Sequence, residues 1–221
     1  MLQPTRNKGF SLVELLVAMV LGLIVVGALY GFYKVQARTL KVQENRQEAQ
    51  EYARGVLDLM AREIRNAGYN PRGVTSGTNC AGTPTAGTPG VVTASSTSFQ
   101  FTYDYRNISN STTPDGNCDD PDEEITYAYQ TPGPQSCASG TGDIVRTANG
   151  TSEAITDCNV TAFSLTYYAK DSSTAMSPVV LANIQRVKVS VTIQSKNPDP
   201  EFGGQLTATV YSNIDLRNVG L

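Results

Sequence analysis

Residues 8–14 read Lys8-Gly9-Phe10-Ser11-Leu12-Val13-Glu14 and lead directly into nineteen residues without a charge, Leu15 to Tyr33. A helix rises about 1.5 Å per residue, so this segment would span about 28 Å, close to the roughly 30 Å hydrocarbon core of a bilayer. It is therefore a predicted transmembrane helix. Arg6 and Lys8 precede it, and basic residues tend to stay on the cytoplasmic side. This tendency places residues 1–8 in the cytoplasm and the rest of the chain beyond the inner membrane.

A cleaved secretory signal peptide is the alternative interpretation of this segment. Such peptides have a shorter apolar core that ends in a cleavage site made of small residues. Here the apolar run is longer, and it continues into a charged, helix-forming sequence without a turn signal. Glu14 also lies at the start of the apolar segment, where an unpaired carboxylate is costly to insert into a bilayer. A residue of that kind usually has a partner and a function.

The N-terminal pattern resembles that of type IV prepilins and pseudopilins. In those proteins a short basic leader ends in Gly, Phe follows, and a Glu stands four residues after the Phe; Gly9, Phe10 and Glu14 match all three. The resemblance implies cleavage after Gly9 by a prepilin peptidase and N-methylation of Phe10. It also implies that Glu14 helps to place the subunit in a growing filament, beside the Phe10 amine of a neighbour. A buried carboxylate and a buried ammonium each need the other, so the physics agrees with this pairing.

The same helix is expected to continue to about Ala67, because no proline occurs between Pro4 and Pro71. Many major pilins have a kinking proline near the position of Gly31, and this chain has none there. From residue 49 onward, apolar residues recur at steps of three and four, which is the stripe of a helix that faces a protein core. The stripe comprises Ala49, Ala53, Val56, Met60, Ile64 and Ala67. Gly68 and then Pro71 supply the stop signal.

Two strings extend the resemblance to a particular branch of these proteins. The string AREIRNAGY, residues 61–69, is similar to the sequence that closes this helix in the PilW family of minor pilins. It is more loosely similar to the J-type pseudopilins of type II secretion. The C-terminal string IDLRNVGL, residues 214–221, is again similar to PilW-like chains. The resemblance is strong over residues 8–69, weak over residues 125–216, and absent in the loops.

The rest of the chain indicates a β-rich domain. Residues 70–97 are rich in Gly, Thr, Pro and Ser and are expected to form a long loop. After them come runs of alternating apolar residues, and Asn149-Gly150 is a hairpin turn signal. Six or seven antiparallel strands packed on one helix predict an α+β fold like that of pilins. The expected parts are a cleaved leader at 1–9, a transmembrane and filament-core helix at 10–33, an amphipathic helix at 34–69, and a periplasmic β-rich domain with disulfides at 70–221.

All four cysteines lie after residue 79, and no two of them have the two-residue spacing of a zinc or thioredoxin-like motif. Their even number suggests disulfides formed in an oxidising compartment, with four reduced core cysteines as the alternative. The order of the expected strands ranks the possible pairings. It brings Cys137 and Cys158 to one end of the sheet and leaves Cys118 at the other end. The predicted disulfides are therefore Cys137–Cys158 and Cys80–Cys118.

Composition argues against several other functions. Residues 1–72 hold ten Lys or Arg and six Asp or Glu, a balance of +4, whereas residues 73–221 hold seven and fourteen, a balance of −7. The acidic part offers no basic patch for nucleic acid. The chain has no His, the commonest general base and metal ligand, and no nucleophile, phosphate-loop or dinucleotide motif. Asp119, Asp120 and Asp122 are a candidate calcium site, but they lack EF-hand spacing and a solvated acidic loop is favoured.

These observations predict a minor pilin of a type IV pilus that joins other minor subunits to prime assembly at or near the filament tip. It is not expected to be an enzyme or to carry a cofactor. Its expected partners are other minor and major pilins, prepilin peptidase and the inner-membrane assembly platform. It would be a single-pass inner-membrane protein before it enters an extracellular pilus. The alternatives are a minor pseudopilin of type II secretion and a tip adhesin or other ligand-binding subunit.

Overall fold

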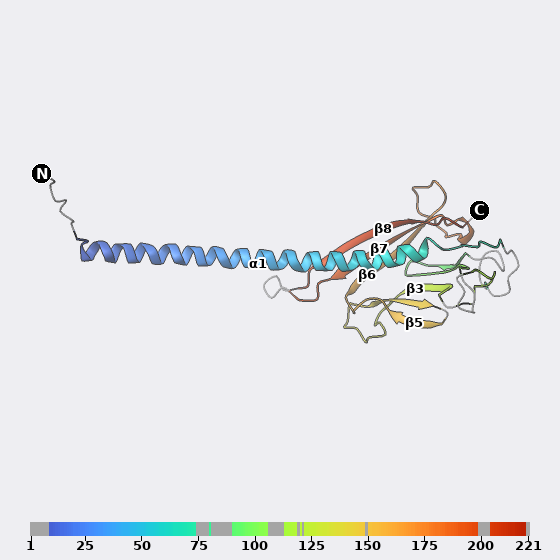
Figure 1. Ribbon diagram of the computed structural model, residues 1–221, viewed down its shortest axis with the longest axis horizontal. Helices are drawn as coiled ribbons and strands as arrows, with labels where there is room; N and C mark the ends of the chain where they lie inside the picture. Colours follow the sequence, from blue (N-terminus) through green and yellow to red (C-terminus); the bar gives the residue numbers. More distant parts are fainter. Residues whose placement is uncertain are drawn as a thin grey trace. The chain divides into compact units, whose positions relative to one another are not determined.

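The computed structural model describes residues 9–73, 80, 90–105, 113–118, 120, 122–148, 150–198 and 204–219 (Figure 1). The chain divides into two compact units, Met1–Glu44 and Asn45–Leu221. One long helix, α1, runs through Leu12–Ile64 and contributes to both units. Within the first unit, every described residue is exposed except Val42, which is half-buried. The second unit holds the hydrophobic core.

The C-terminal half of α1 buries the predicted stripe. All six of its members, Ala49 to Ala67, are buried, and Leu57 and Ala61 widen the buried face. The helix ends three residues earlier than expected, at Ile64, and a turn covers residues 65–68. Gly68 closes this turn with a φ of +77°, a conformation that glycine adopts without the steric cost that other residues meet. Its N–H donates to Thr102 O at 2.9 Å, which ties the end of the helix to the sheet.

Within the described residues, eight strands form two antiparallel sheets. The five-stranded sheet follows chain order and comprises β1 (Val91–Ala94), β2 (Ser98–Thr102), β3 (Glu124–Gln130), β4 (Asp143–Ala148) and β5 (Thr151–Ala154). The three-stranded sheet comprises β6 (Val160–Tyr168), β7 (Arg186–Gln194) and β8 (Thr207–Asp215), and the 3-10 turn η1 (Leu181–Asn183) lies between β6 and β7. Figure 1 shows β6, β7 and β8 running alongside the second half of α1.

This arrangement confirms the α+β class, with differences in detail. The strands form two sheets rather than one, because alternation of apolar residues identifies strands but not their hydrogen-bonded neighbours. β1 lies inside the stretch that was expected to be a loop throughout. Within the five-stranded sheet, β2 ends at Thr102 and β5 ends at Ala154. In the expected turn, Gly150 has a φ of +83°, while Asn149 lies outside the described residues.

One apolar core joins α1 to both sheets. It combines the buried stripe with inward-facing side chains of β2 and β3 on one side and of β6, β7 and β8 on the other. Phe99 lies 5.7 Å, centroid to centroid, from Tyr167, so ring packing links β2 to β6. The Leu165 N–H also donates to Ser96 O at 2.8 Å. The second unit is thus a folded body with its own core.

Candidate functional site

The N-terminal segment presents the predicted processing and assembly residues at the surface. Gly9 and Phe10 precede α1, and the Phe10 side chain is 84 % exposed. Glu14 lies in the first turn of α1 and is exposed. A carboxylate at this position is favoured by the partial positive charge of the helix N-terminus. Residues 1–8 of the expected leader, which comprises residues 1–9, lie outside the described residues.

The apolar residues that follow Glu14 are exposed in the part of the chain that the structure describes. An 18-residue window of α1 has a mean hydropathy of 2.8, with none of it buried, so α1 is long and apolar enough to cross a membrane. Burying a Leu, Val or Ile side chain is worth about 1.5–3 kcal/mol, so this surface is stable only within a bilayer or against other helices. Its largest exposed side chains are Leu12, Val13, Leu15, Leu16, Val17, Met19, Val20, Leu21, Leu23, Ile24, Val25, Val26, Leu29, Tyr30, Phe32 and Tyr33.

Glu14 stands out in this surface by its charge. Across the described residues, no hydrogen bond or ion pair joins its carboxylate to another group of the same chain. Gly22, Gly27 and Gly31 also have open space where a side chain would stand, so another helix can approach α1 closely at these points. The segment can therefore take both a cationic partner and closely packed helices from other molecules.

A polar cluster that the sequence analysis did not identify fixes α1 to the five-stranded sheet. Glu63 on α1 accepts hydrogen bonds from Arg146 on β4, with Nε–Oε1 and Nε–Oε2 distances of 3.1 Å and an Nη2–Oε1 distance of 3.0 Å. The Tyr127 hydroxyl on β3 also donates to Glu63. Asp122 accepts a further bond from Arg146 Nη2 at 3.0 Å. This cluster determines how the end of α1 is seated on the domain.

Burial controls the protonation of this cluster. Burial and the hydrogen bond to Glu63 raise the pKa of Tyr127 far above its ordinary value. Burial alone would lower the pKa of Arg146, but its bonds to Glu63 and Asp122 outweigh this and raise it. Both groups therefore keep their protons throughout the physiological range. No local pattern reveals the cluster in the sequence, because Arg146 lies 83 residues from Glu63.

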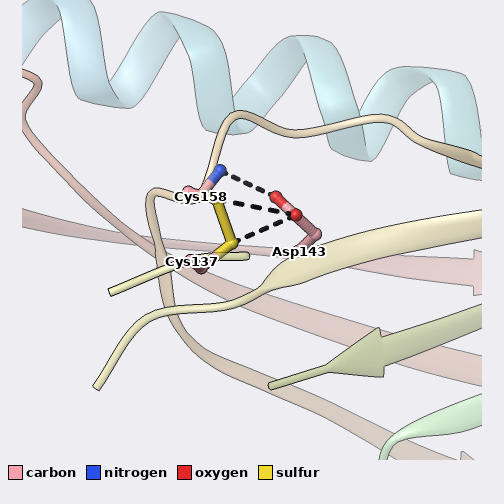
Figure 2. A group of neighbouring side chains, drawn as sticks. All are labelled: Cys137, Asp143 and Cys158. Atoms are coloured by element: carbon pink, nitrogen blue, oxygen red, sulfur yellow. Dashed lines mark hydrogen bonds between the residues drawn. A yellow bond between two sulfur atoms is a disulfide. The ribbon is translucent and has the colours of Figure 1, made fainter. Parts of the chain in front are cut away.

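The structure joins Cys80 to Cys118 and Cys137 to Cys158 in two disulfides, the pairs that the strand order predicts. The second links the loop after β3 to the segment after β5, and its two sulfur atoms lie beside the carboxylate of Asp143 (Figure 2). Asp143 Oδ2 is 3.1 Å from Cys137 Sγ. The three groups could be mistaken for a metal site, but both sulfurs are already committed to the disulfide.

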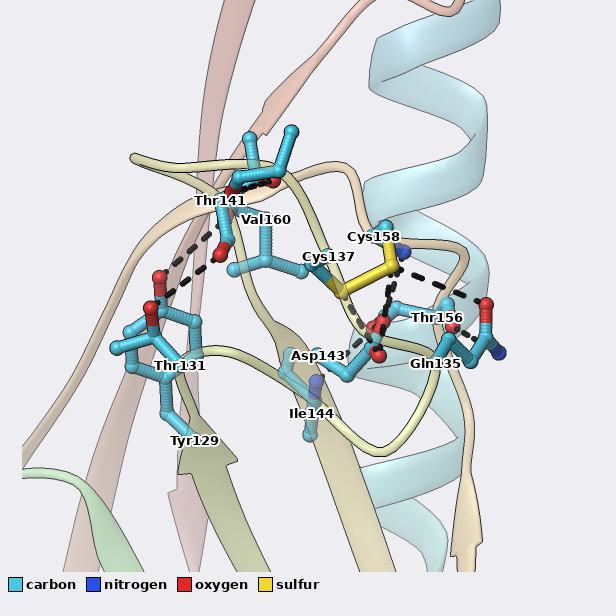
Figure 3. The surroundings of a disulfide bond; sticks show 11 residues. Tyr129, Thr131, Gln135, Cys137, Thr141, Asp143, Ile144, Thr156, Cys158 and Val160 are labelled. Atoms are coloured by element: carbon cyan, nitrogen blue, oxygen red, sulfur yellow. Dashed lines mark hydrogen bonds between the residues drawn. A yellow bond between two sulfur atoms is a disulfide. The ribbon is translucent and has the colours of Figure 1, made fainter.

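Asp143, the first residue of β4, organises the loops around this disulfide. Its buried carboxylate accepts hydrogen bonds from Cys158 N at 2.7 Å and from the Thr156 hydroxyl at 3.2 Å. The Thr156 hydroxyl in turn accepts from Ile144 N at 2.9 Å, so the group forms a connected network (Figure 3). A side chain at Gly133 would come within 2.2 Å of Asp143 Oδ2. The position thus requires glycine, and the disulfide is part of a closely packed corner.

Two of the three candidate calcium residues, Asp120 and Asp122, lie in the part of the chain that the structure describes. Asp119 lies outside the described residues. Asp120 is buried, and its N–H donates to Glu123 Oε2 at 3.2 Å. Asp122 is engaged with Arg146.

Comparison with known proteins gives two family matches. The model of the prokaryotic N-terminal methylation motif matches residues 4–30, which include Gly9, Phe10 and Glu14. The model of prepilin peptidase-dependent protein B matches residues 42–212, well over half of the chain. No curated protein matches the chain, and no solved structure does. The two matches together cover both the exposed helix and the folded domain.

Proposed function

We propose, because the chain belongs to the family of prepilin peptidase-dependent protein B, that it is a minor pilin of a type IV pilus. The methylation motif and the family together make it a pilin-like protein that prepilin peptidase processes and that an apolar helix anchors in the membrane. The family does not distinguish a minor pilin from a pseudopilin. The resemblance to PilW, which rests on residues 61–69 and 214–221, favours the pilin.

The observation that supports this role best is the contrast between the two units. The second unit buries its own core, whereas the apolar first half of α1 is exposed to the extent that the structure describes the chain. In the proposed mechanism, the membrane covers this surface before assembly and helices of neighbouring subunits cover it afterwards. Transfer from one apolar environment to the other keeps the helix out of water throughout. The role requires no catalysis.

In this proposal, Glu14 positions the subunit during assembly by pairing with a charge on a neighbouring subunit. A carboxylate in an apolar helix is stabilised by a cation, and the new amine of Phe10 in an adjacent subunit is a cation at the same depth. We further propose cleavage after Gly9, an inner-membrane position with the C-terminus in the periplasm, and placement at or near the filament tip with other minor subunits. The basic residues before the helix support this orientation.

Mass spectrometry of purified filaments tests the proposal. Pili are sheared from cells and purified, and this chain is quantified against the major pilin, with a strain that lacks the gene as the control. The expected result is a chain that begins at Phe10 and is present far below the amount of the major pilin. Presence in the membrane, absence from pili and a secretion defect in the deletion strain would instead indicate a type II secretion pseudopilin.

A further inference from the structure

Two depressions adjoin at the C-terminal end of α1, and both involve the string at residues 61–69. One, of about 440 Å³, is lined by Arg62, Arg65, Asn66, Tyr69, Arg217 and Asn218. The other, of about 340 Å³, shares Asn66 and Tyr69 and adds Tyr103 and Tyr105. Arg217 and Asn218 belong to the C-terminal string at residues 214–221. The fold thus brings together the two strings that carry the resemblance to PilW.

Specific contacts hold the C-terminal segment beside the end of α1. Leu216 N donates to Gln185 O at 2.8 Å, and Gln185 Nε2 donates to Val219 O at 2.7 Å. A side chain at Gly68 would lie 2.8 Å from Asn218 O, so the absence of one allows this close approach. On the other side, Asp104 N donates to Tyr69 O at 2.9 Å. Arg217 is therefore fixed next to the arginines of α1.

The arginines of this depression all carry a positive charge. Arg62, Arg65 and Arg217 are exposed, and no acidic residue lines the depression. None of the three forms a salt bridge to the residues that the structure describes. The negative end of the helix dipole accounts for Arg62, in the last turn of α1, and for Arg65, directly after the helix. It does not account for Arg217, which arrives from the other end of the sequence.

We propose that this surface, the arginine depression, binds an acidic segment of another filament subunit through that subunit's carboxylates. The planar guanidinium presents paired N–H donors that match the two oxygens of a carboxylate. Tyr69, 41 % exposed, lies between the two depressions and offers a ring for the same segment to pack on. Arginine and tyrosine are the residue types enriched at the centres of protein interfaces. This proposal rests on the role as a filament subunit.

A protein segment fits the surface better than the other anionic ligands. The lining arginines are exposed and the depression is open, which suits a peptide laid across it rather than an enclosed small molecule. Residues 73–221 carry a net charge of −7, which disfavours a long polyanion such as DNA. The local positive charge therefore selects a short acidic stretch, held at one point of an otherwise acidic domain.

Site-directed photocrosslinking in cells that assemble filaments tests this inference. Benzoylphenylalanine replaces Tyr69 in the full-length chain, and crosslinked peptides are identified by mass spectrometry. The expected product joins residue 69 to an Asp- or Glu-rich peptide of another pilin-like subunit. Arg65→Glu with Arg217→Glu should lower its yield about tenfold, the factor that corresponds to about 1.4 kcal/mol. Arg54→Glu is the matched control, because Arg54 is exposed on α1 but does not line either depression.

A compensating charge reversal distinguishes loss of the contact from misfolding of the variant chain. Replacing the acidic residues of the captured peptide by Lys should restore the crosslink to the Arg65→Glu, Arg217→Glu chain. An unchanged yield in that chain, a failure of the Lys substitutions to restore it, or crosslinks to peptides without acidic residues would overturn the proposal. So would binding of a single-stranded oligonucleotide that depends on Arg65 and Arg217 without a subunit crosslink. If the chain is absent from pili but crosslinks to an acidic peptide of a pseudopilin, the binding site is supported and the role in a pilus is rejected. Failure of the binding-site proposal can therefore be distinguished from failure of the proposed function.

Discussion

Glu63 and Arg146 form a forked ion pair across the interface between α1 and the five-stranded sheet. Their side chains are only 19 % and 12 % exposed, so both charges are largely removed from water. Desolvating two charges is costly, and the pair is stable because both ends make further hydrogen bonds, to Tyr127 and Asp122. The pair sets the rotation of this end of α1 over the sheet, and with it the position of Arg62 and of Arg65, which follows the helix.

Removing one partner of this pair should be far more damaging than removing both. Arg146→Leu leaves the Glu63 charge buried without its main partner, and we expect a loss of about 3–5 kcal/mol in the free energy of unfolding. Glu63→Leu combined with Arg146→Leu should recover most of that loss. Chemical unfolding of the detergent-solubilised chain, followed by tyrosine fluorescence, measures both. Lys196→Leu, which removes the exposed pair with Asp157, is the control and should cost under about 1 kcal/mol. Equal losses in the single and double variants would contradict this account.

Stability should fall at alkaline pH because of Tyr127. Burial and the bond to Glu63 raise its pKa in the folded state above the ordinary value of about 10 that it has in the unfolded chain. Above about pH 10 the folded state therefore retains a proton that the unfolded state loses. The contribution of Tyr127 to the free energy of unfolding is fully present below about pH 10 and declines above it. Tyr127→Phe should be less stable at pH 7 but should show a shallower decline between pH 10 and pH 11. Tyr103 and Tyr167, whose pKa values burial also raises, contribute to the decline that remains, as do Tyr52 and Tyr129. An identical slope in the variant would exclude Tyr127 as a contributor.

The contrast between the apolar stripe and this ion pair shows what sequence can predict. The stripe from Ala49 to Ala67 follows from helical periodicity alone, and every member is buried. Glu63 follows Arg62 and precedes Ile64, so its sequence neighbourhood does not distinguish it from the solvated acids of the same helix. The burial of Glu63 depends on its ion pair with Arg146, which lies on β4 of the five-stranded sheet. A pairing of that range leaves no periodic signal in either segment.

The sheets show the same limit. β7 alternates buried and half-buried residues along its whole length, and this pattern is visible in the sequence. β1 has only four residues and lies between Gly-rich and Ser-rich segments, so no pattern of useful length marks it. The disulfide between Cys137 and Cys158 depends on the strand order β3, β4 and β5, which consecutive hairpins produce. The arginine depression depends on the packing of the chain's end, which no local pattern encodes.

Processing should depend on the small residue at position 9. We expect Gly9→Val to prevent cleavage between residues 9 and 10, because a branched side chain next to the scissile bond obstructs a protease site. The membrane fraction should then contain a chain that starts at its original N-terminus. N-terminal sequencing and intact-mass measurement report this, with a strain that lacks prepilin peptidase as the reference. A mature N-terminus at Phe10 in the variant would show that cleavage does not depend on Gly9.

Assembly should depend on the charge at position 14, whereas membrane insertion should not. Glu14→Val removes a carboxylate that is costly in an apolar helix, so insertion should be equal or better. The amine of a neighbouring subunit then loses its partner, and we expect incorporation into filaments to fall at least about tenfold, as for loss of about 1.4 kcal/mol. Glu14→Asp, which keeps the charge on a shorter side chain, is the control. It should be incorporated into filaments in larger amounts than the Glu14→Val chain. Equal filament number and equal content of this chain in all three strains would refute a pairing role.

The Cys137–Cys158 disulfide should stabilise the folded domain. It closes a loop with a sequence separation of 21, and constraint of the unfolded chain by a loop of this size contributes about 3 kcal/mol. Replacing both cysteines by Ser should therefore lower the free energy of unfolding by about 3 kcal/mol.

Asp143 should slow the reduction of this disulfide. Reduction passes through a thiolate, and a carboxylate 3.1 Å from Cys137 Sγ disfavours that negative charge. Asp143→Asn, whose side-chain oxygen can still accept from Cys158 N, should therefore be reduced faster by dithiothreitol than the unaltered chain, as followed by thiol labelling and peptide mapping. The Cys80–Cys118 bond serves as the internal reference in the same sample. A peptide map that joins Cys80 to Cys137 or Cys158, or equal reduction rates in both chains, would contradict this account.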